Sequence, residues 1–126
     1  MSTEGLRVFV AEDEFLVALL LEDELRSVGY SVVGPFTTLS VAMQAAHGAE
    51  FDAAVLDVNL NGEMVYPLAD QLLTARVPFL FLTGYGVANL PERFRASPRL
   101  AKPYDPATLI REIKRIAPKD ISKTPA

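Results

Sequence analysis

Five side chains that could take part in metal or phosphoryl chemistry stand directly after apolar stretches of the chain. Glu12 and Asp13 follow LRVFVA, Asp57 ends AAVLD, Thr83 ends PFLFLT, and Lys102 follows Leu-Ala. Three carboxylates that share a pocket raise one another's pKa, so a divalent cation is their natural neutraliser. Carboxylate oxygens without thiolate or imidazole partners favour Mg²⁺ or Mn²⁺ over zinc.

The other two side chains suit an anion better than a metal ion. The Lys102 ammonium is a compact positive charge, and the Thr83 hydroxyl can donate to phosphoryl oxygens. Asp57 is then the group that could attack phosphorus and carry the phosphoryl group as an acyl phosphate. Together the residues indicate phosphoryl transfer to a carboxylate.

The elements that must position these residues are short strands rich in β-formers. The residues of the central strands are almost all apolar and do not alternate with polar ones. This pattern predicts that other elements cover both faces of these strands. We predict strands at Leu6–Ala11, Tyr30–Val33, Ala53–Val58, Pro78–Thr83 and Leu100–Ala101. Gly34-Pro35 is expected to stop the second strand, and Asn-Gly-Glu after Leu60 is expected to form a turn.

Helices are predicted between these strands. The predicted ranges are Phe15–Val28, Thr38 to about His47, Val65–Arg76, and Asp105 to about Ala117. Thr38 and Asp105 are expected N-caps, and proline is tolerated in a first turn. The apolar face of the first helix is expected to consist of Val17, Leu20, Leu21, Leu25 and Val28. Residues 84–98 contain two glycines and two prolines, so a helix there would be short or unstable.

The predicted fold class is therefore α/β, with five strand–helix units in a doubly wound parallel sheet of order 2-1-3-4-5. Ligands bind such sheets beyond the carboxyl ends of the strands, where the strand order reverses. That edge would collect all five chemically competent side chains. We predict one domain over residues 6–117, an N-terminal tail at 1–5 and a polar C-terminal tail at 118–126.

Composition excludes several other classes of protein. The 126 residues contain no cysteine, which excludes disulfides and thiolate metal sites. The net charge of −4 is a weak argument against sequence-independent binding of nucleic acid, which normally uses a basic patch. The longest uninterrupted apolar run, Phe15–Leu21, is too short to cross a membrane, and the N-terminus does not have a signal peptide pattern. We expect a cytoplasmic protein that acts without nucleic acid or membrane.

Four stretches in this order resemble the receiver domain of two-component response regulators, which has a flavodoxin-like fold. They are VAEDE (10–14), VLDVNL (55–60), FLTGYG (81–86) and KPYD (102–105). The resemblance implies that Asp57 is the phosphoacceptor and that Glu12, Asp13, Asp57 and the backbone carbonyl of Asn59 hold Mg²⁺, with Mn²⁺ as an alternative. It also implies phosphoryl-binding and switch roles for Thr83 and Lys102, and a cis peptide bond before Pro103.

The same resemblance implies partners and an output. A sensor histidine kinase or a histidine phosphotransfer protein would supply the phosphoryl group, and an unknown downstream protein would recognise the altered surface. Because the resemblance covers essentially the whole chain, we expect a stand-alone receiver that is not an enzyme, apart from slow self-dephosphorylation.

Two positions depart from the receiver pattern. Asn61 replaces a frequent proline, and Arg99 replaces a frequent aromatic switch residue. PFLFLTGYG resembles, in part, the receiver subgroup with a Phe-Ala-Thr-Gly motif. We therefore expect the output surface, with Tyr85, Arg99 and Tyr104, to rearrange in a way that differs from the common threonine-to-aromatic coupling. Tyr104 is interpreted mainly as a packing residue.

Three other functions compete with that of a receiver. An aspartate-nucleophile phosphatase would need a second acid two residues after Asp57, where Asn59 cannot give up a proton. Nucleotide binding lacks both common glycine-rich loop patterns. A protein-binding module on the same fold that needs no phosphorylation stays open, because of Asn61 and Arg99. Glu14 is interpreted as a helix N-terminal acid, which the helix dipole favours.

Overall fold

A five-stranded parallel sheet forms the centre of the molecule. The structure is a computed structural model that describes residues 5–84 and 90–118. The strand order is β2-β1-β3-β6-β7, which is the predicted 2-1-3-4-5 order. The strands are β1 (Arg7–Ala11), β2 (Ser31–Phe36), β3 (Ala53–Asp57), β6 (Phe79–Thr83) and β7 (Arg99–Ala101). The predicted fold class is confirmed.

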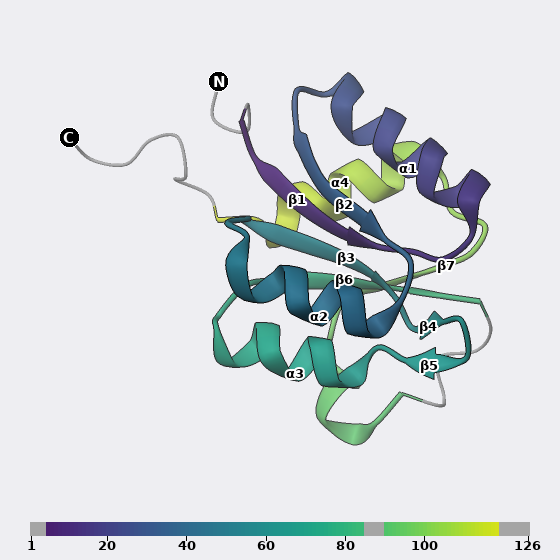
Figure 1. The fold of residues 1–126 in the computed structure, drawn as a ribbon. Helices are drawn as coiled ribbons and strands as arrows, with labels where there is room; N and C mark the ends of the chain where they lie inside the picture. Colours follow the sequence, from purple (N-terminus) through teal and green to yellow (C-terminus); the bar gives the residue numbers. More distant parts are fainter. Residues whose placement is uncertain (1–4, 85–89, 119–126) are drawn as a thin grey trace.

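Helices cover both faces of the sheet (Figure 1). They are α1 (Phe15–Ser27), α2 (Leu39–Gly48), α3 (Tyr66–Thr74) and α4 (Pro106–Ile116). Two separate cores result. One is formed by α2, α3 and one side of the sheet, and the other by α1, α4 and the opposite side. All five residues of β3 and of β6 are buried, as expected for strands with both faces covered.

The sequence prediction was wrong about the end of the second strand. β2 continues through Gly34-Pro35 to Phe36, and the Gly34–Pro35 peptide bond is cis. Proline is tolerated because β2 lies at the edge of the sheet, where one side needs no ladder hydrogen bonds. Gly34 has a φ of +111°, and a Cβ atom there would lie 2.8 Å from the Val10 carbonyl oxygen, so this position requires glycine.

The first helix buries only part of the predicted face, because Leu21 and Leu25 are buried as predicted but other predicted residues are not. Its buried residues are Ala18, Leu21 and Leu25, whereas Leu20 and Val28 are exposed. The cause is that residues 15–21 are apolar on all sides of the helix, so periodicity alone could not select the buried stripe. The consequence is an exposed apolar surface made of Phe15, Leu16, Leu19 and Leu20.

Among the described residues, the place of a helix between β6 and β7 is taken by a short 3-10 turn, Glu92–Phe94. Phe94 is buried and stacks on Tyr66 of α3, with ring centroids 5.7 Å apart. Arg93 lies over the Phe94 ring and forms a two-pronged ion pair with Asp70 of α3, at 2.8 and 2.9 Å. These contacts fix the turn to α3. Tyr85 and Gly86, which belong to this segment, lie outside the described residues.

A small antiparallel hairpin follows β3 and was not predicted beyond its turn. It consists of β4 (Asn59–Leu60) and β5 (Glu63–Met64). The two turn residues between them, Asn61 and Gly62, have φ values of 53° and 88°, which is the pattern of a two-residue type I′ hairpin. None of the helices in the described ranges combines the length and apolar character that a membrane span requires.

Candidate functional site

Three carboxylates converge at the carboxyl end of the two central strands. Glu12 and Asp13 directly follow β1, Asp57 ends β3, and these strands are neighbours with Ala11 opposite Leu56. One carboxylate oxygen from each residue lies within 4.8 Å of the others. Glu12 is 0% and Asp57 6% exposed, and Asp13 is half-buried. The arrangement offers several oxygen ligands around one point, which fits a hard divalent cation.

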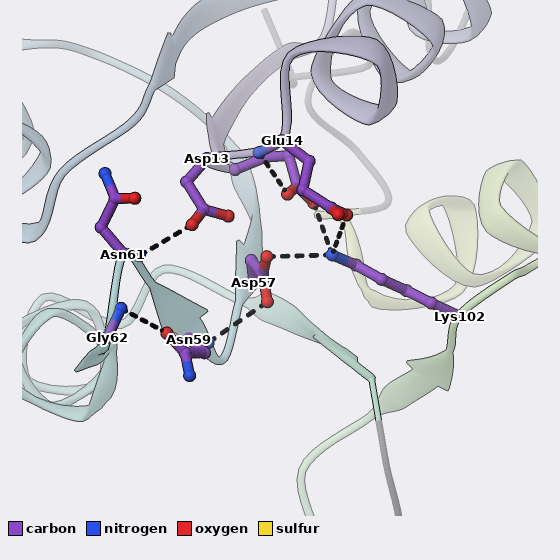
Figure 2. A network of polar contacts seen from close by, with 8 residues as sticks. Asp13, Glu14, Asp57, Asn59, Asn61, Gly62 and Lys102 are labelled. Carbon is purple, nitrogen blue, oxygen red and sulfur yellow. Dashed lines mark hydrogen bonds and ion pairs between the residues drawn. The ribbon is translucent and has the colours of Figure 1, made fainter.

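Lys102 is the cation that reaches these carboxylates from the opposite side of the site (Figure 2). Its Nζ atom lies 2.9 Å from Oδ2 of Asp57 and 3.0 Å from Oε1 of Glu12. A backbone hydrogen bond of 2.8 Å from the Lys102 N–H to the Thr83 carbonyl oxygen anchors the residue just beyond β7. Burial lowers the pKa of the ammonium, but hydrogen bonds and charge from Asp57 and Glu12 raise that pKa above its ordinary value.

Burial also changes the protonation of Glu12. Desolvation, helped by the neighbouring Asp57 carboxylate, raises the pKa of Glu12 to about 7, against the opposing effects of the Glu14 N–H and Lys102. The N–H of Glu14 donates to Oε2 of Glu12 at 3.0 Å. Without a bound metal ion, the Glu12 carboxyl group is therefore expected to change its protonation state near neutral pH.

Backbone N–H groups of the β4–β5 hairpin hold the two other carboxylates. The Asn59 N–H donates to Oδ1 of Asp57 at 3.2 Å, and the Asn61 N–H donates to Oδ2 of Asp13 at 2.7 Å. The Asn59 side chain in turn accepts a 2.7 Å hydrogen bond from the Gly62 N–H (Figure 2). The hairpin thus orients the acids, a contribution that the Asn-Gly pair after an apolar strand could have revealed from the sequence.

Thr83 lies at the carboxyl end of β6, between β3 and β7. It stands opposite Ala101, directly before Lys102, and the preceding Leu82 stands opposite Asp57. Its hydroxyl is buried and has no hydrogen-bond partner among the described residues. A buried hydroxyl without a partner is costly unless a ligand supplies one. This atom is suited to a phosphoryl oxygen.

The residues after Lys102 line a groove next to the site. The Lys102–Pro103 peptide bond is cis. Tyr104 is half-buried and packs against the core shared by α1 and α4. Its burial, together with the charges of Glu24 and Glu12, raises the pKa of the phenol to about 12, so the hydroxyl stays protonated at neutral pH.

Arg99, at the position of the expected switch residue, is half-buried on β7. Its guanidinium donates to the carbonyl oxygens of Ser97 and Arg95. These hydrogen bonds connect β7 to the loop that follows the 3-10 turn. Of the three residues expected at an output surface, Arg99 and Tyr104 are therefore placed by the structure. Tyr85 lies outside the described residues.

One acid near the site was not assigned to it from the sequence. Oε1 of Glu14 lies 3.6 Å from the Lys102 Nζ atom, and the Glu14 side chain is 65% exposed. Glu14 is the N-cap of α1, but its side chain forms no cap hydrogen bond. Sequence spacing could place Glu14 at the start of the helix but not beside Lys102. That contact depends on how the loop between β7 and α4 lies against α1 in the folded protein.

Comparison with characterised sequences gives two kinds of relative, whereas no family model matches the chain. The chain is 31% identical over 112 residues to the transcriptional regulatory protein PdtaR of Mycobacterium tuberculosis, covering 86% of this chain and 55% of PdtaR. It is 31% identical over 118 residues to the phyllosphere-induced regulator PhyR of Methylorubrum extorquens, covering 86% and 41%. The chain spans about half the length of these curated relatives.

Solved structures match over nearly their whole length. SdrG of Sphingomonas melonis Fr1 is 34% identical with a TM-score of 0.79, covering 92% of this chain and 98% of SdrG. The signal receiver domain of a diguanylate cyclase from Desulfovibrio desulfuricans G20 is 30% identical, with a TM-score of 0.79 and coverage of 90% and 94%. The receiver domain of the sensor histidine kinase PA1611 of Pseudomonas aeruginosa PAO1, with magnesium in its active-site cleft, is 26% identical, with a TM-score of 0.76 and coverage of 89% and 97%.

Relatives and solved structures that are 30–34% identical each match 86–92% of this chain. The chain therefore belongs to the receiver-domain family of two-component response regulators.

Proposed function

We propose that this chain accepts a phosphoryl group on Asp57 and signals through changed contacts with other proteins. The observation that carries the proposal is the environment of the Asp57 carboxylate. It lies 2.9 Å from the Lys102 ammonium and beside two further acids. The neighbouring strand β6 ends in Thr83, whose buried hydroxyl has no hydrogen-bond partner among the described residues. Residues 6–117 are the unit to which the proposal applies.

The residues present fit a magnesium ion. Glu12, Asp13 and Asp57 supply the clustered carboxylate oxygens, and the Asn59 carbonyl is the fourth proposed ligand. Mn²⁺ has the same preference for oxygen ligands. When bound, the metal ion would neutralise charge on the carboxylates and on the transferring phosphoryl group. The solved PA1611 receiver domain, which contains magnesium in its active-site cleft, supports this assignment.

The proposed transfer is a single displacement at phosphorus. An oxygen of the Asp57 carboxylate forms a bond to phosphorus while the phosphorus–nitrogen bond of a phosphohistidine breaks, and the electron pair of that bond returns to the imidazole. Lys102 and Thr83 would pair with the phosphoryl oxygens. Slow hydrolysis by water would later release inorganic phosphate and restore the Asp57 carboxylate. The rigid position of Asp57 at the end of a buried strand favours alignment with the donor.

The donor in this proposal is a histidine kinase or a histidine phosphotransfer protein. The exposed apolar surface of α1 supports a protein donor, because it lies directly after the acidic residues 12–14 and its four side chains are 44–76% exposed. They are Phe15, Leu16, Leu19 and Leu20. Clustered exposed apolar side chains mark protein-binding surfaces. Tyr85, Arg99 and Tyr104 are the proposed output residues that a downstream protein would read.

Intact-mass measurement tests the proposal. The wild-type chain and Asp57→Asn are incubated with acetyl phosphate, with and without Mg²⁺. The proposal expects one added phosphoryl group in the wild type, which requires both the metal ion and Asp57. If no adduct forms and beryllium fluoride with Mg²⁺ also fails to bind, phosphorylation is not the switch, and the phosphorylation-independent binding module becomes the better account.

A further inference from the structure

Glu14 places a third carboxylate on the ammonium group that the phosphoryl group would need. Its Oε1 atom lies 3.6 Å from the Lys102 Nζ atom (Figure 2). The other two partners of that ammonium, Glu12 and Asp57, are buried and closer, at 3.0 and 2.9 Å. The Glu14 side chain is 65% exposed, so it can leave the ammonium at little cost.

The position of Glu14 in α1 does not by itself require this contact. An acid at a helix N-cap commonly accepts a hydrogen bond from a backbone N–H in the first turn. The Glu14 side chain forms no such bond, although its residue is the N-cap of α1. Its carboxylate is directed to Lys102 instead, which indicates a contribution to the site and not to the helix end.

Glu14 also lines a groove that reaches Lys102. This groove, with a volume of about 450 Å³, runs between the start of α1 and the loop after β7, lined by Val17, Leu20, Pro103 and Tyr104, and both Glu14 and Lys102 line it. A small anion that approaches Lys102 along this groove therefore meets the negative charge of Glu14.

We propose that Glu14 competes with phosphoryl groups for Lys102 and thereby disfavours small anionic phosphodonors. The inference rests on the proposed phosphoacceptor function and adds a residue that sets donor specificity. Before transfer, Glu14 shares the Lys102 ammonium with Glu12 and Asp57. After transfer, the phosphoryl oxygens displace Glu14, whose carboxylate moves into water. A protein donor can offset this charge with cationic side chains of its own, whereas acetyl phosphate and inorganic anions cannot.

The test compares Glu14→Gln with the wild type in binding of beryllium fluoride in the presence of Mg²⁺, followed by fluorine NMR. Asp23→Asn is the matched control, because Asp23 is an exposed acid on the same helix and its replacement changes the net charge equally. We expect Glu14→Gln to bind beryllium fluoride about two- to five-fold more tightly, in line with the strength of an exposed ion pair. Phosphorylation by acetyl phosphate should accelerate by a similar factor, and Asp23→Asn should match the wild type.

A second arm uses ionic strength. The gain in beryllium fluoride affinity of Glu14→Gln should shrink when the ionic strength is raised from about 0.1 M to about 1 M. The screening length then falls from about 10 Å to about 3 Å. Unchanged or weaker binding by Glu14→Gln, or an equal gain in Asp23→Asn, would overturn the inference while leaving the proposed function intact. Failure of the wild type itself to bind beryllium fluoride and to accept phosphate would overturn the proposed function, and this inference with it.

Discussion

The Lys102 ammonium nitrogen lies 2.9 Å from Oδ2 of Asp57, and this ion pair joins the carboxyl end of β3 to the loop after β7. The same nitrogen lies 3.0 Å from Oε1 of Glu12. Lys102 is therefore the counter-ion of two buried carboxylates. Two buried acids without a cation would be costly, so Lys102 contributes to stability as well as to the proposed chemistry.

Lys102→Met is expected to destabilise the metal-free protein by about 3 kcal/mol, the lower end of the cost of breaking a buried ion pair. Saturating Mg²⁺ should recover much of that loss, because a divalent cation replaces the missing positive charge. Urea unfolding in EDTA and in Mg²⁺ measures both values. Lys114→Met, an exposed lysine on α4, is the control and should stay within about 0.5 kcal/mol of wild type. An equal loss in both buffers would contradict the counter-ion role.

The raised pKa of Glu12 predicts that the stability of the protein depends on pH in metal-free buffer. The folded protein raises the pKa of Glu12 from its ordinary 4.5 to about 7, so the folded state binds the proton more tightly than the unfolded state does. This contribution to stability is complete below about pH 4.5 and is lost as the pH rises through about 7. The free energy of unfolding should therefore decline over that window in the wild type and decline less in Glu12→Gln. Parallel pH profiles for the two proteins would contradict the assignment.

The fully buried strands could be predicted from the sequence, and they determine most of the site. Ala53–Asp57 and Phe79–Thr83 are nearly continuous apolar runs that end in a polar residue, so both the strand and its functional end are visible in the pattern. The parallel-sheet rule then brings the strand ends together. This is why Glu12, Asp13 and Asp57 were expected to meet, as they do.

The remaining features depend on tertiary contacts that no local pattern contains. The edge position of β2 permits Pro35 within a strand. The sheet selects Ala18, Leu21 and Leu25 from a helix whose first half is apolar on all sides. Asp105 occupies the N-cap of α4, as predicted, but its side chain makes no cap hydrogen bond. The contact of Glu14 with Lys102 joins elements that are distant in sequence, so spacing could not reveal it.

Phe94 is predicted to be the main anchor of the 3-10 turn. It is fully buried, and its ring lies 5.4 Å from that of Phe81 and 5.7 Å from that of Tyr66. Phe94→Ala should cost about 3–5 kcal/mol in the free energy of unfolding, as for other buried aromatic truncations. Phe15→Ala removes the same side chain from an exposed position, 76% accessible, and should change stability by less than about 0.5 kcal/mol. Urea unfolding of both variants measures these changes. Similar losses of unfolding free energy in the two variants would contradict the anchor role of Phe94.

The exposed apolar surface of α1 predicts that a substitution there slows phosphoryl transfer from a protein donor but not from a small-molecule donor. Leu16→Ser should slow transfer from a phosphorylated histidine phosphotransfer protein that is active on the wild type by about five- to ten-fold, the effect of losing an apolar interface anchor. The rate with acetyl phosphate should be unchanged. Leu73→Ser, at an exposed leucine on α3, serves as the control and should affect neither rate. A loss with both donors would show damage to the site and not to docking.

The central claim is that the Asp57 carboxylate itself carries the phosphoryl group, and reductive trapping tests it most directly. After incubation with acetyl phosphate and Mg²⁺, sodium borohydride reduces an aspartyl phosphate to homoserine, and peptide mass spectrometry locates the change. The account predicts homoserine in place of Asp57 in the wild type, only in samples that contained Mg²⁺. Homoserine in place of Asp13, 5-hydroxynorvaline in place of Glu12 or Glu14, or a metal-dependent mass gain that persists in Asp57→Asn would contradict it.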